Sequence, residues 1–244
     1  MLATCLEQYE IPGLQAIAVE GISKLMLSKM LRDEELLKQL VLLYFDPDTA
    51  DNLKLRQCLS YFLPMYCHSS QDNQVLMQKI LVPTILSLIQ MHHDLSKEQE
   101  MVAPPQIIQM MVDWTDPRRV VLSRLNPDAA KAIDLGLHAE VAVDVLKALF
   151  IETVATTRKL LVQILNKLYI DEAGEIRLKK LTMLAGNLKS RKPLTDAMTR
   201  NMFNKFEAAL LKFFENKPEA LDDDEIEQVE EYKELLDFVE SVED

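Results

Sequence analysis

Residues able to support catalysis are few and scattered along this chain of 244 residues. His92 and His93 are neighbours and point about 100° apart on a helix, so they cannot bind one metal ion together. His68 and His138 are isolated, and Cys67 adjoins His68 only in sequence, whereas a thiol–imidazole couple needs proximity in the fold. The chain has no glycine-rich phosphate loop, no His-Glu-x-x-His and no Cys-x-x-Cys. We therefore expect no enzyme, no cofactor and no metal site.

Basic side chains gather in one short stretch, residues 177–205, where eight lysines and arginines face a single acid, Asp196. Duplex DNA carries one negative charge per about 1.7 Å of its axis, so cations along an edge between helices can follow its backbone. The simpler alternative is a solvated helix face followed by a polar loop. The first candidates for DNA phosphate contacts are Arg177, Lys179, Lys180, Lys189, Arg191 and Lys192.

A second basic motif is Asp116-Pro117-Arg118-Arg119, with Arg124 shortly after it. Two adjacent arginines after the end of a helix can hold phosphate groups, and they can equally cap the last carbonyls of that helix. Both interpretations stay open, and Arg118, Arg119 and Arg124 form the second set of DNA-binding candidates.

The acidic residues are concentrated at the C-terminal end. Residues 215–244 contain 14 acidic and two basic side chains, which accounts for the whole net charge of −12, so residues 1–214 are neutral. Apolar residues in this segment recur at helical spacing, namely Ile226, Val229, Tyr232, Leu236 and Val239. We expect an amphipathic helix that docks on the last repeat with its acidic face outward. It serves either as a solubilising cap or as a screen that competes with phosphate.

The elements that must position these groups are helices. The chain has only five glycines, far below the usual ~7%, and apolar residues recur at helical rather than alternating spacing nearly throughout. No apolar stretch approaches about 20 residues without a charge, so no membrane partner is expected. Three cysteines without paired spacing fit a reducing compartment. Met1 leads directly into helix-like sequence, and we expect the chain to begin inside a longer protein.

Turn residues divide the chain into helix pairs. The expected helices are 12–29 with 33–45, 50–67 with 71–91, 105–115 with a less certain partner, 145–169 with 175–189, and 194–216 with 223–242. Successive pairs start about 40 residues apart, within the range of HEAT and armadillo repeats. A helical bundle would show the same spacing, but short connections between antiparallel helices favour an all-α solenoid of HEAT type. Residues 1–214 would form the repeat lobe and residues 215–244 the acidic capping helix.

One region resembles a known family. Residues 42–52 read LLYFDPDTADN, residues 55–64 read LRQCLSYFLP, and residues 66–70 read YCHSS. These stretches closely resemble the C-terminal region of the condensin subunit 3 family, whose members are HEAT-repeat subunits of condensin. The resemblance is carried mainly by residues about 40–90. The motif itself is expected to be structural, with Leu55, Leu59 and Phe62 buried and Arg56 either on the surface or paired with Asp48 or Asp51.

The resemblance implies a non-enzymatic chromosomal subunit in the nucleus, with the cytoplasm as the alternative outside mitosis. Its expected partners are the kleisin subunit, through kleisin the SMC ATPase subunits, and double-stranded DNA held without sequence preference during chromosome condensation. The alternative is an armadillo or HEAT-type adaptor or transport protein that binds an extended peptide along its concave face without nucleic acid. Clustered methionines, such as Met110 and Met111, suit a peptide groove but more often fill a core.

Overall fold

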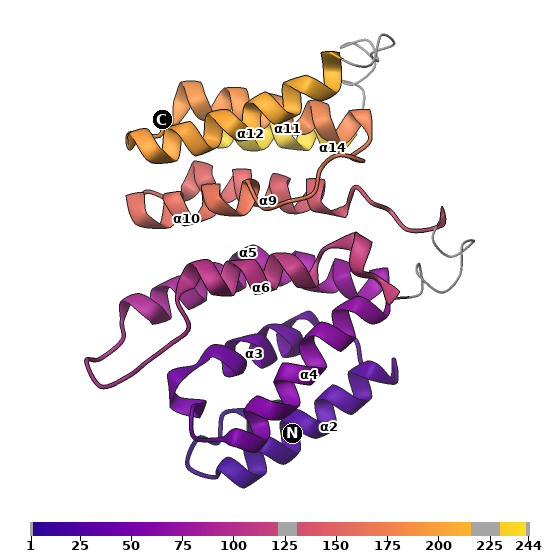
Figure 1. Ribbon diagram of the computed structural model, residues 1–244, viewed down its shortest axis with the longest axis vertical. Helices are drawn as coiled ribbons and strands as arrows, with labels where there is room; N and C mark the ends of the chain where they lie inside the picture. The colour runs from indigo at the N-terminus through magenta and orange to yellow at the C-terminus, as the bar shows by residue number, and fades with distance from the viewer. Residues whose placement is uncertain (1, 122–130, 216–229, 243–244) are drawn as a thin grey trace. The chain divides into compact units, whose positions relative to one another are not determined.

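The structure is a computed structural model that describes residues 2–121, 131–215 and 230–242. Every regular element in these ranges is helical and none is a strand, which confirms the all-α expectation. The chain forms two compact units, Met1–Ile133 and Asp134–Asp244, each with its own core (Figure 1). The predicted boundary between residues 214 and 215 stays a prediction.

Unit 1 is built from helices that pack on one another. Its helices are α1 (Leu2–Leu6), α2 (Pro12–Leu27), α3 (Glu34–Phe45), α4 (Leu53–Ser69), α5 (Gln71–His93) and α6 (Pro104–Trp114). Helix α2 packs against α4, α3 packs against α5, and α6 packs against α5 and α4. The sequence left the partner of the 105–115 helix uncertain, and the structure places it on the preceding pair.

Side-chain caps explain where two of these helices begin. Asp33 accepts the N–H of Leu36 at 2.9 Å at the start of α3, and Asn52 accepts the N–H of Leu55 at 3.3 Å at the start of α4. Such caps satisfy backbone donors that lack a partner within the helix. Only Ser70 separates α4 from α5, so these two helices must turn back on each other.

The same Asp-Pro turn follows two different helices. After α3, Asp46 accepts the N–H of Asp48 at 3.0 Å and begins the 3-10 turn η1 (Pro47–Thr49). After α6, Asp116 accepts the N–H of Arg118 at 3.0 Å and begins the turn η2 (Pro117–Arg119). Proline suits the first position of such a turn, because its fixed φ matches the turn and its missing N–H costs no hydrogen bond.

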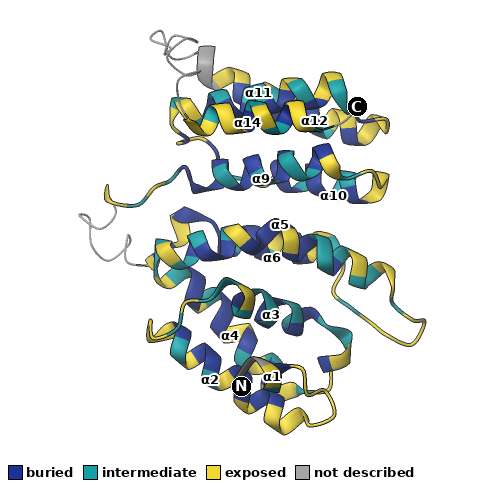
Figure 2. Ribbon diagram, turned by 180° about the vertical axis from the view of Figure 1, so that it is seen from behind, coloured by how far each residue is buried: buried dark blue, intermediate teal, exposed yellow. Residues whose placement is uncertain are grey.

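The helices of unit 1 carry both buried and exposed residues (Figure 2), and the buried ones are largely apolar. On α4, Leu55, Leu59, Phe62 and Tyr66 are all buried, as predicted from their spacing. Among the described helices α5 is long and apolar enough to cross a membrane. Its buried residues, however, pack against α3, α4 and α6, so its composition is that of a core helix.

Unit 2 contains the described helices α9 (Leu137–Ile151), α10 (Ala155–Leu165), α11 (Glu175–Arg191), α12 (Ala197–Glu215) and α14 (Glu230–Ser241). The expectation of one helix over 145–169 is wrong, because α9 ends at Ile151 and α10 starts at Ala155. At this break the Glu152 carboxylate accepts the N–H groups of Thr153 and Val154, at 2.8 and 2.7 Å. These side-chain bonds take the place of hydrogen bonds within a helix. The helix therefore ends here, although apolar residues continue at helical spacing beyond Glu152.

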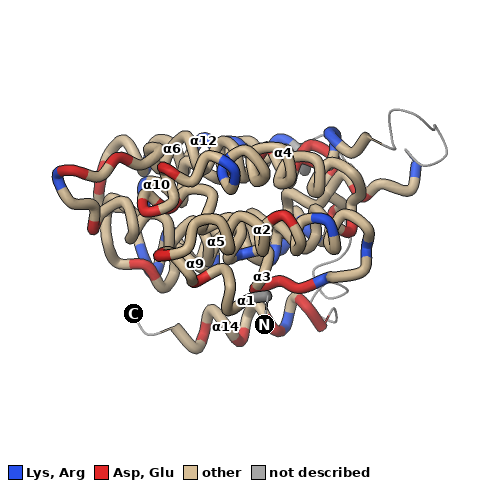
Figure 3. Tube along the Cα trace, turned by 90° about the horizontal axis from the view of Figure 1, so that it is seen from below, with Lys and Arg blue, Asp and Glu red and all other residues tan. Residues whose placement is uncertain are grey.

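The last described helix lies on the α9–α11 face of unit 2. Helix α9 packs against α11, α10 packs against α12, and α14 packs against α11. Figure 3 shows acidic residues in red along α14. Leu235 and Val239 of α14 are buried, whereas Glu231, Glu234, Asp237 and Glu240 lie toward solvent. Helix α14 thus presents an apolar face to the unit and an acidic face to solvent. Much of the expected 223–242 helix lies outside the described residues, which resume at Glu230.

Candidate nucleic-acid and partner interfaces

Arg177 begins the basic stretch on the first turns of α11 and is held by two carboxylates of its own unit. Its guanidinium donates to both oxygens of Asp134, at 2.7 and 2.6 Å, and to Glu140 on α9 at 2.7 Å. These bonds raise the pKa of Arg177 and hold the pKa of the Asp134 carboxyl below its usual range. Gly136 permits the contact, because a Cβ at this position would collide with Nη1 of Arg177. Arg177 therefore ties α11 to the start of α9.

Lys180 lies one turn further along α11 and is 3% exposed. Its ammonium group forms an ion pair with Glu231 in the first turn of α14, and the Glu231 side chain is itself largely exposed. The bond to Lys180 lowers the pKa of the Glu231 carboxyl. A buried ammonium group needs such a partner, because leaving water without one is costly. Lys180 is thus covered by α14 and does not face solvent.

Arg191 ends α11 and binds the other end of α14. Its two terminal nitrogens donate to the carbonyl oxygens of Val239 and Val242, the second at 2.8 Å. The last carbonyls of a helix lack partners within the helix and carry a partial negative charge, so a guanidinium stabilises that end. Because Lys180 binds the start of α14 and Arg191 binds its end, α14 runs in the same direction as α11.

Three candidates of the first set remain, namely Lys179, Lys189 and Lys192. Lys189 is exposed and pairs with Glu207 of α12 at 2.9 Å. Lys179 and Lys192 are half-buried. Lys189 is thus the exposed member of the first candidate set, and the burial of Lys179 and Lys192 is intermediate, like that of Arg177 and Arg191.

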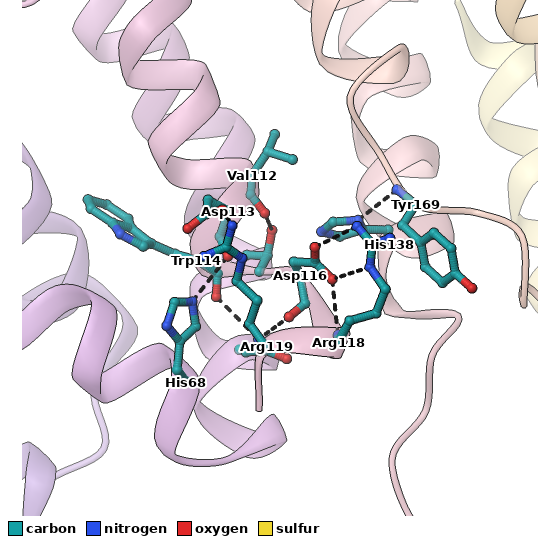
Figure 4. A network of polar contacts seen from close by, with 11 residues as sticks. His68, Val112, Asp113, Trp114, Asp116, Arg118, Arg119, His138 and Tyr169 are labelled. Atoms are coloured by element: carbon teal, nitrogen blue, oxygen red, sulfur yellow. Dashed lines mark hydrogen bonds and ion pairs between the residues drawn. The ribbon is translucent and has the colours of Figure 1, made fainter. Parts of the chain in front are cut away.

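Arg118 and Arg119 follow α6 and are both exposed (Figure 4). Arg118 grips Asp116 with two nitrogens, at 2.9 and 2.7 Å, and Arg119 pairs with Asp113. They bind aspartate side chains close to them in sequence, and the choice between a phosphate contact and a helix cap stays open. Arg124 lies outside the described residues.

The basic stretch has acidic partners that its own sequence does not reveal. Counted within residues 177–205 the cations have almost no acids to pair with them, but the fold brings partners from distant segments. The carboxylates of Asp134, Glu140, Glu207 and Glu231 bind Arg177, Lys189 and Lys180. A charge count within one stretch does not include groups that the fold brings to it.

An apolar groove on unit 1 was not predicted from the sequence. It has a volume of about 950 Å³ and lies between the end of α3, α4 and the segment before and within α6. Leu53 (75% exposed) and Tyr61 (65%) line it from α4, and Val102 and Met110 line it from the other side. Leu53 and Tyr61 lie on one side of α4, but polar Gln57 lies between them, so the sequence gives only a weak signal for this second face. Met110 lines the groove while Met111 fills the core.

Arg56 supports one wall of this groove. Its guanidinium donates to the backbone carbonyls of Tyr44, Asp46 and Thr49, which close the end of α3 and the turn after it. It pairs with neither of the aspartates considered from the sequence. The motif that carried the family resemblance therefore builds a rigid helix connection, as expected.

Cys67, His68 and His138, which were considered for catalysis, lie apart from one another or within the packed core. The Cys67 thiol is fully buried, and burial raises its pKa. Its neighbour His68 contacts the backbone carbonyl of Asp113 at 3.2 Å, and buried His138 accepts the N–H of Tyr169 at 2.9 Å (Figure 4). Within the described ranges no three His, Cys, Asp or Glu side chains are grouped to hold a metal ion.

Successive helices that pack on one another, with no strand in the described residues, define a helical-repeat protein of HEAT type. A family model described as "Nuclear condensing complex subunits, C-term domain" matches residues 1–170. The chain therefore belongs to this family, that of condensin subunit 3, and the resemblance noted in the sequence is confirmed.

Individual relatives agree with the family. Condensin complex subunit 3 of Schizosaccharomyces pombe is 32% identical over 171 residues, which are 70% of this chain and 20% of the relative. The subunit of Saccharomyces cerevisiae is 28% identical over 203 residues, which are 80% of this chain and 19% of the relative. The chain thus spans about a fifth of the length of these curated relatives.

The fold agrees with a solved structure as well. A chain of the crystal structure of the S. pombe condensin Cnd3–Cnd2 subcomplex superposes with a TM-score of 0.73 at 27% sequence identity. The match covers 86% of this chain and 27% of that chain. It includes residues beyond those matched by the family model, so the helical-repeat fold extends into unit 2.

Proposed function

We propose that this chain is a non-catalytic part of a condensin that binds the kleisin subunit and contributes phosphate contacts to double-stranded DNA. Through kleisin it would be joined to the SMC ATPase subunits, and it would act on nuclear chromosomes during mitotic condensation. The observation that carries the proposal is the exposed apolar groove of unit 1 in a chain of the condensin subunit 3 family. The related Cnd3 chain was crystallised with Cnd2, the kleisin subunit, which supports a partner of this class.

The groove suits an extended partner segment with apolar side chains. Leu53 and Tyr61 are largely exposed, and exposed apolar side chains grouped in a hollow favour a binding site. Tyrosine is also enriched among residues that dominate binding energy, because it offers a large rigid surface with a polar tip. Met110 on the opposite wall can adapt its shape to the bound segment.

Surface cations support the DNA part of the proposal. Arg118, Arg119 and Lys189 are exposed and Lys179 and Lys192 are partly exposed, whereas Arg177, Lys180 and Arg191 are engaged within unit 2. Lysines and arginines that contact phosphates bind DNA without reading its sequence. The proposed contacts are therefore electrostatic and sensitive to salt.

Titration of the purified chain with a recombinant kleisin fragment tests the partner assignment. Leu53→Ala and Tyr61→Ala should each weaken the complex by about tenfold or more, as truncation of a central anchor does. Ile17→Ala is a matched control, because Ile17 is equally exposed but lies on α2 outside the groove. Equal affinities for all four proteins would remove the groove from the proposal.

The groove also favours a second function, that of an adaptor that binds a peptide without nucleic acid. The two functions differ in one measurement, a gel shift with duplex DNA carried out with and without the kleisin fragment. A shift that requires or is strengthened by kleisin supports the condensin function. Peptide binding with no shift under either condition supports the adaptor.

A further inference from the structure

Three cations of unit 2 lie beneath α14 and contact it. Lys180 pairs with Glu231, Arg191 binds the carbonyls at the end of α14, and the ammonium of Lys147 lies 5.7 Å from the ring centroid of Phe238. Lys147 comes from α9 and the other two from α11. One short acidic helix therefore satisfies three positive groups on a single face of the unit.

The apolar part of this contact is narrow. Leu235 and Val239 are buried, and the Phe238 ring meets the Phe150 ring of α9 edge-on at a centroid distance of 5.9 Å. A 12-residue helix is marginal in water by itself, so α14 depends on these contacts for its helical state. Loss of a few apolar contacts should therefore release it as a unit.

Solvent reaches the edge of this contact. A hollow of about 430 Å³ beside the Lys180–Glu231 pair is lined by Arg177, Lys180 and the carboxylates of Glu140, Glu175 and Glu231. Glu231 is largely exposed although Lys180 is not, so solvent reaches the carboxylate side of this pair. With α14 removed, Lys180 would lose the carboxylate of Glu231 and Arg191 would lose the carbonyls of Val239 and Val242, and a buried ammonium group without its anion is costly.

We propose that α14 is a removable acidic cover over a phosphate-binding face formed by Lys147, Lys180 and Arg191, and that the DNA backbone competes with α14 for this face. This inference rests on the proposed DNA-binding function and adds its regulation. The carboxylate of Glu231 and the carbonyls at the end of α14 occupy the positions that phosphate oxygens would take. Binding of α14 and binding of DNA then oppose each other, and each weakens the other by the same factor.

The test uses the full chain in complex with the kleisin fragment and a fluorescently labelled DNA duplex. Leu235→Ala with Phe238→Ala weakens the apolar contact of α14 without changing any charge. This variant should bind DNA at least about fivefold more tightly. Its plot of log affinity against log salt should be steeper by about 2–3, because each newly bound phosphate adds about 0.9 to the slope.

Two variants that change the net charge equally distinguish loss of the Lys180–Glu231 contact from a general effect of charge. Glu231→Gln removes the partner of Lys180, whereas Glu234→Gln removes one exposed acid of the same helix. Tighter DNA binding by the Glu231 variant alone supports the cover. An equal change in both variants would mean that only overall charge matters, and it would overturn the proposal.

Hydrogen exchange provides a readout that does not depend on affinity. Amides of residues 230–241 should exchange faster when duplex DNA is added to the unmodified complex, because DNA displaces α14. If the unmodified complex binds DNA and neither affinity nor exchange responds to α14 release, the cover is wrong and the proposed function stands. If neither the unmodified nor the released protein binds DNA, the DNA-binding function itself fails.

Discussion

At the scale of single residues, the basic side chains of this chain divide by position. Arg177, Lys180 and Arg191 hold helices of unit 2 together, whereas Lys189 is exposed. Sequence could identify the charges but not this division, because the partners of the first group lie 37 to 51 residues away. Only the packing of the helices brings residues so far apart in sequence into contact.

The Arg177 cluster should contribute to stability in a pH-dependent way. Arg177→Ala should lower the free energy of unfolding by about 1–2 kcal/mol, since bonds between charged groups are worth more than neutral ones but Asp134 is half-exposed. The folded-state pKa of Asp134 lies below its ordinary value of 3.8. The contribution is therefore complete above about pH 4 and is lost as pH falls through the lowered value.

Urea unfolding of both proteins at pH 7 and pH 3 measures this difference. Lys189→Ala serves as the control, because its pair with Glu207 is exposed on the lysine side and should be worth about 0.5 kcal/mol or less. A difference for Arg177→Ala that is the same at both pH values would contradict the assignment to Asp134.

The three cysteines should differ in reactivity. Cys67 is completely buried and its pKa is raised by burial, so the reactive thiolate is scarce in the native protein. Cys5 and Cys58 are partly accessible. Mass spectrometry after alkylation of the native protein should find Cys5 and Cys58 modified before Cys67, and the order should disappear in denaturant. Early modification of Cys67 would show that the core of α4 opens readily.

At the scale of elements, α4 carries two different faces. Its buried stripe contains Leu59, and its exposed stripe contains Leu53 and Tyr61. The first holds unit 1 together and the second lines the groove. Substitutions on the buried face should therefore change stability, and substitutions on the exposed face should change partner binding.

Alanine substitutions on the two faces should separate stability from binding. Leu59→Ala should lower the free energy of unfolding by about 2–5 kcal/mol, because it leaves a cavity in a packed core. Tyr61→Ala should change it by about 0.5 kcal/mol or less, since the ring is 65% exposed. Thermal unfolding of both variants measures this, and similar losses at the two positions would contradict the two-faced description.

Most of the described helices can be predicted from the sequence, but one break and one groove cannot. Helix existence was predicted for α2 to α6, α11 and α12, because their apolar stripes are long and several of their starts carry caps or prolines. The break between α9 and α10 was missed because Ile151 and Val154 keep the apolar period while the Glu152 side chain ends the helix. The groove was missed because its walls come from segments that only the fold brings together.

At the scale of the whole molecule, charge is segregated along the chain. Residues 1–214 carry as many basic as acidic side chains, and all of the net charge of −12 lies in residues 215–244. Salt screens exposed charges beyond about 8–10 Å, so local fields rather than the total should govern the proposed DNA contact.

Reversal of two surface charges tests whether local fields rather than total charge govern the DNA contact. Lys179→Glu with Lys192→Glu should weaken DNA binding by the kleisin complex and reduce the slope of log affinity against log salt by about 2, or about 0.9 for each phosphate that is no longer bound. These two lysines are preferable to Lys180, whose burial would confuse binding with folding.

Lys24→Glu with Lys79→Glu makes the same change of charge on unit 1, where both lysines are exposed. The slope should stay unchanged in this control. A parallel loss in both double variants would assign the effect to total charge, and no loss in either would discard the α11 surface as a DNA contact.

The fork of hydrogen bonds from Arg56 has a consequence for how this family can diverge. Its acceptors are the main-chain carbonyls of Tyr44, Asp46 and Thr49 and the hydroxyl of Thr49, so the side chains at positions 48, 50 and 51 can change while these bonds persist. Lysine at position 56 could not reach all of these acceptors, since it presents a single nitrogen. An evolutionary comparison should find arginine retained at this position while the residues at 48, 50 and 51 drift.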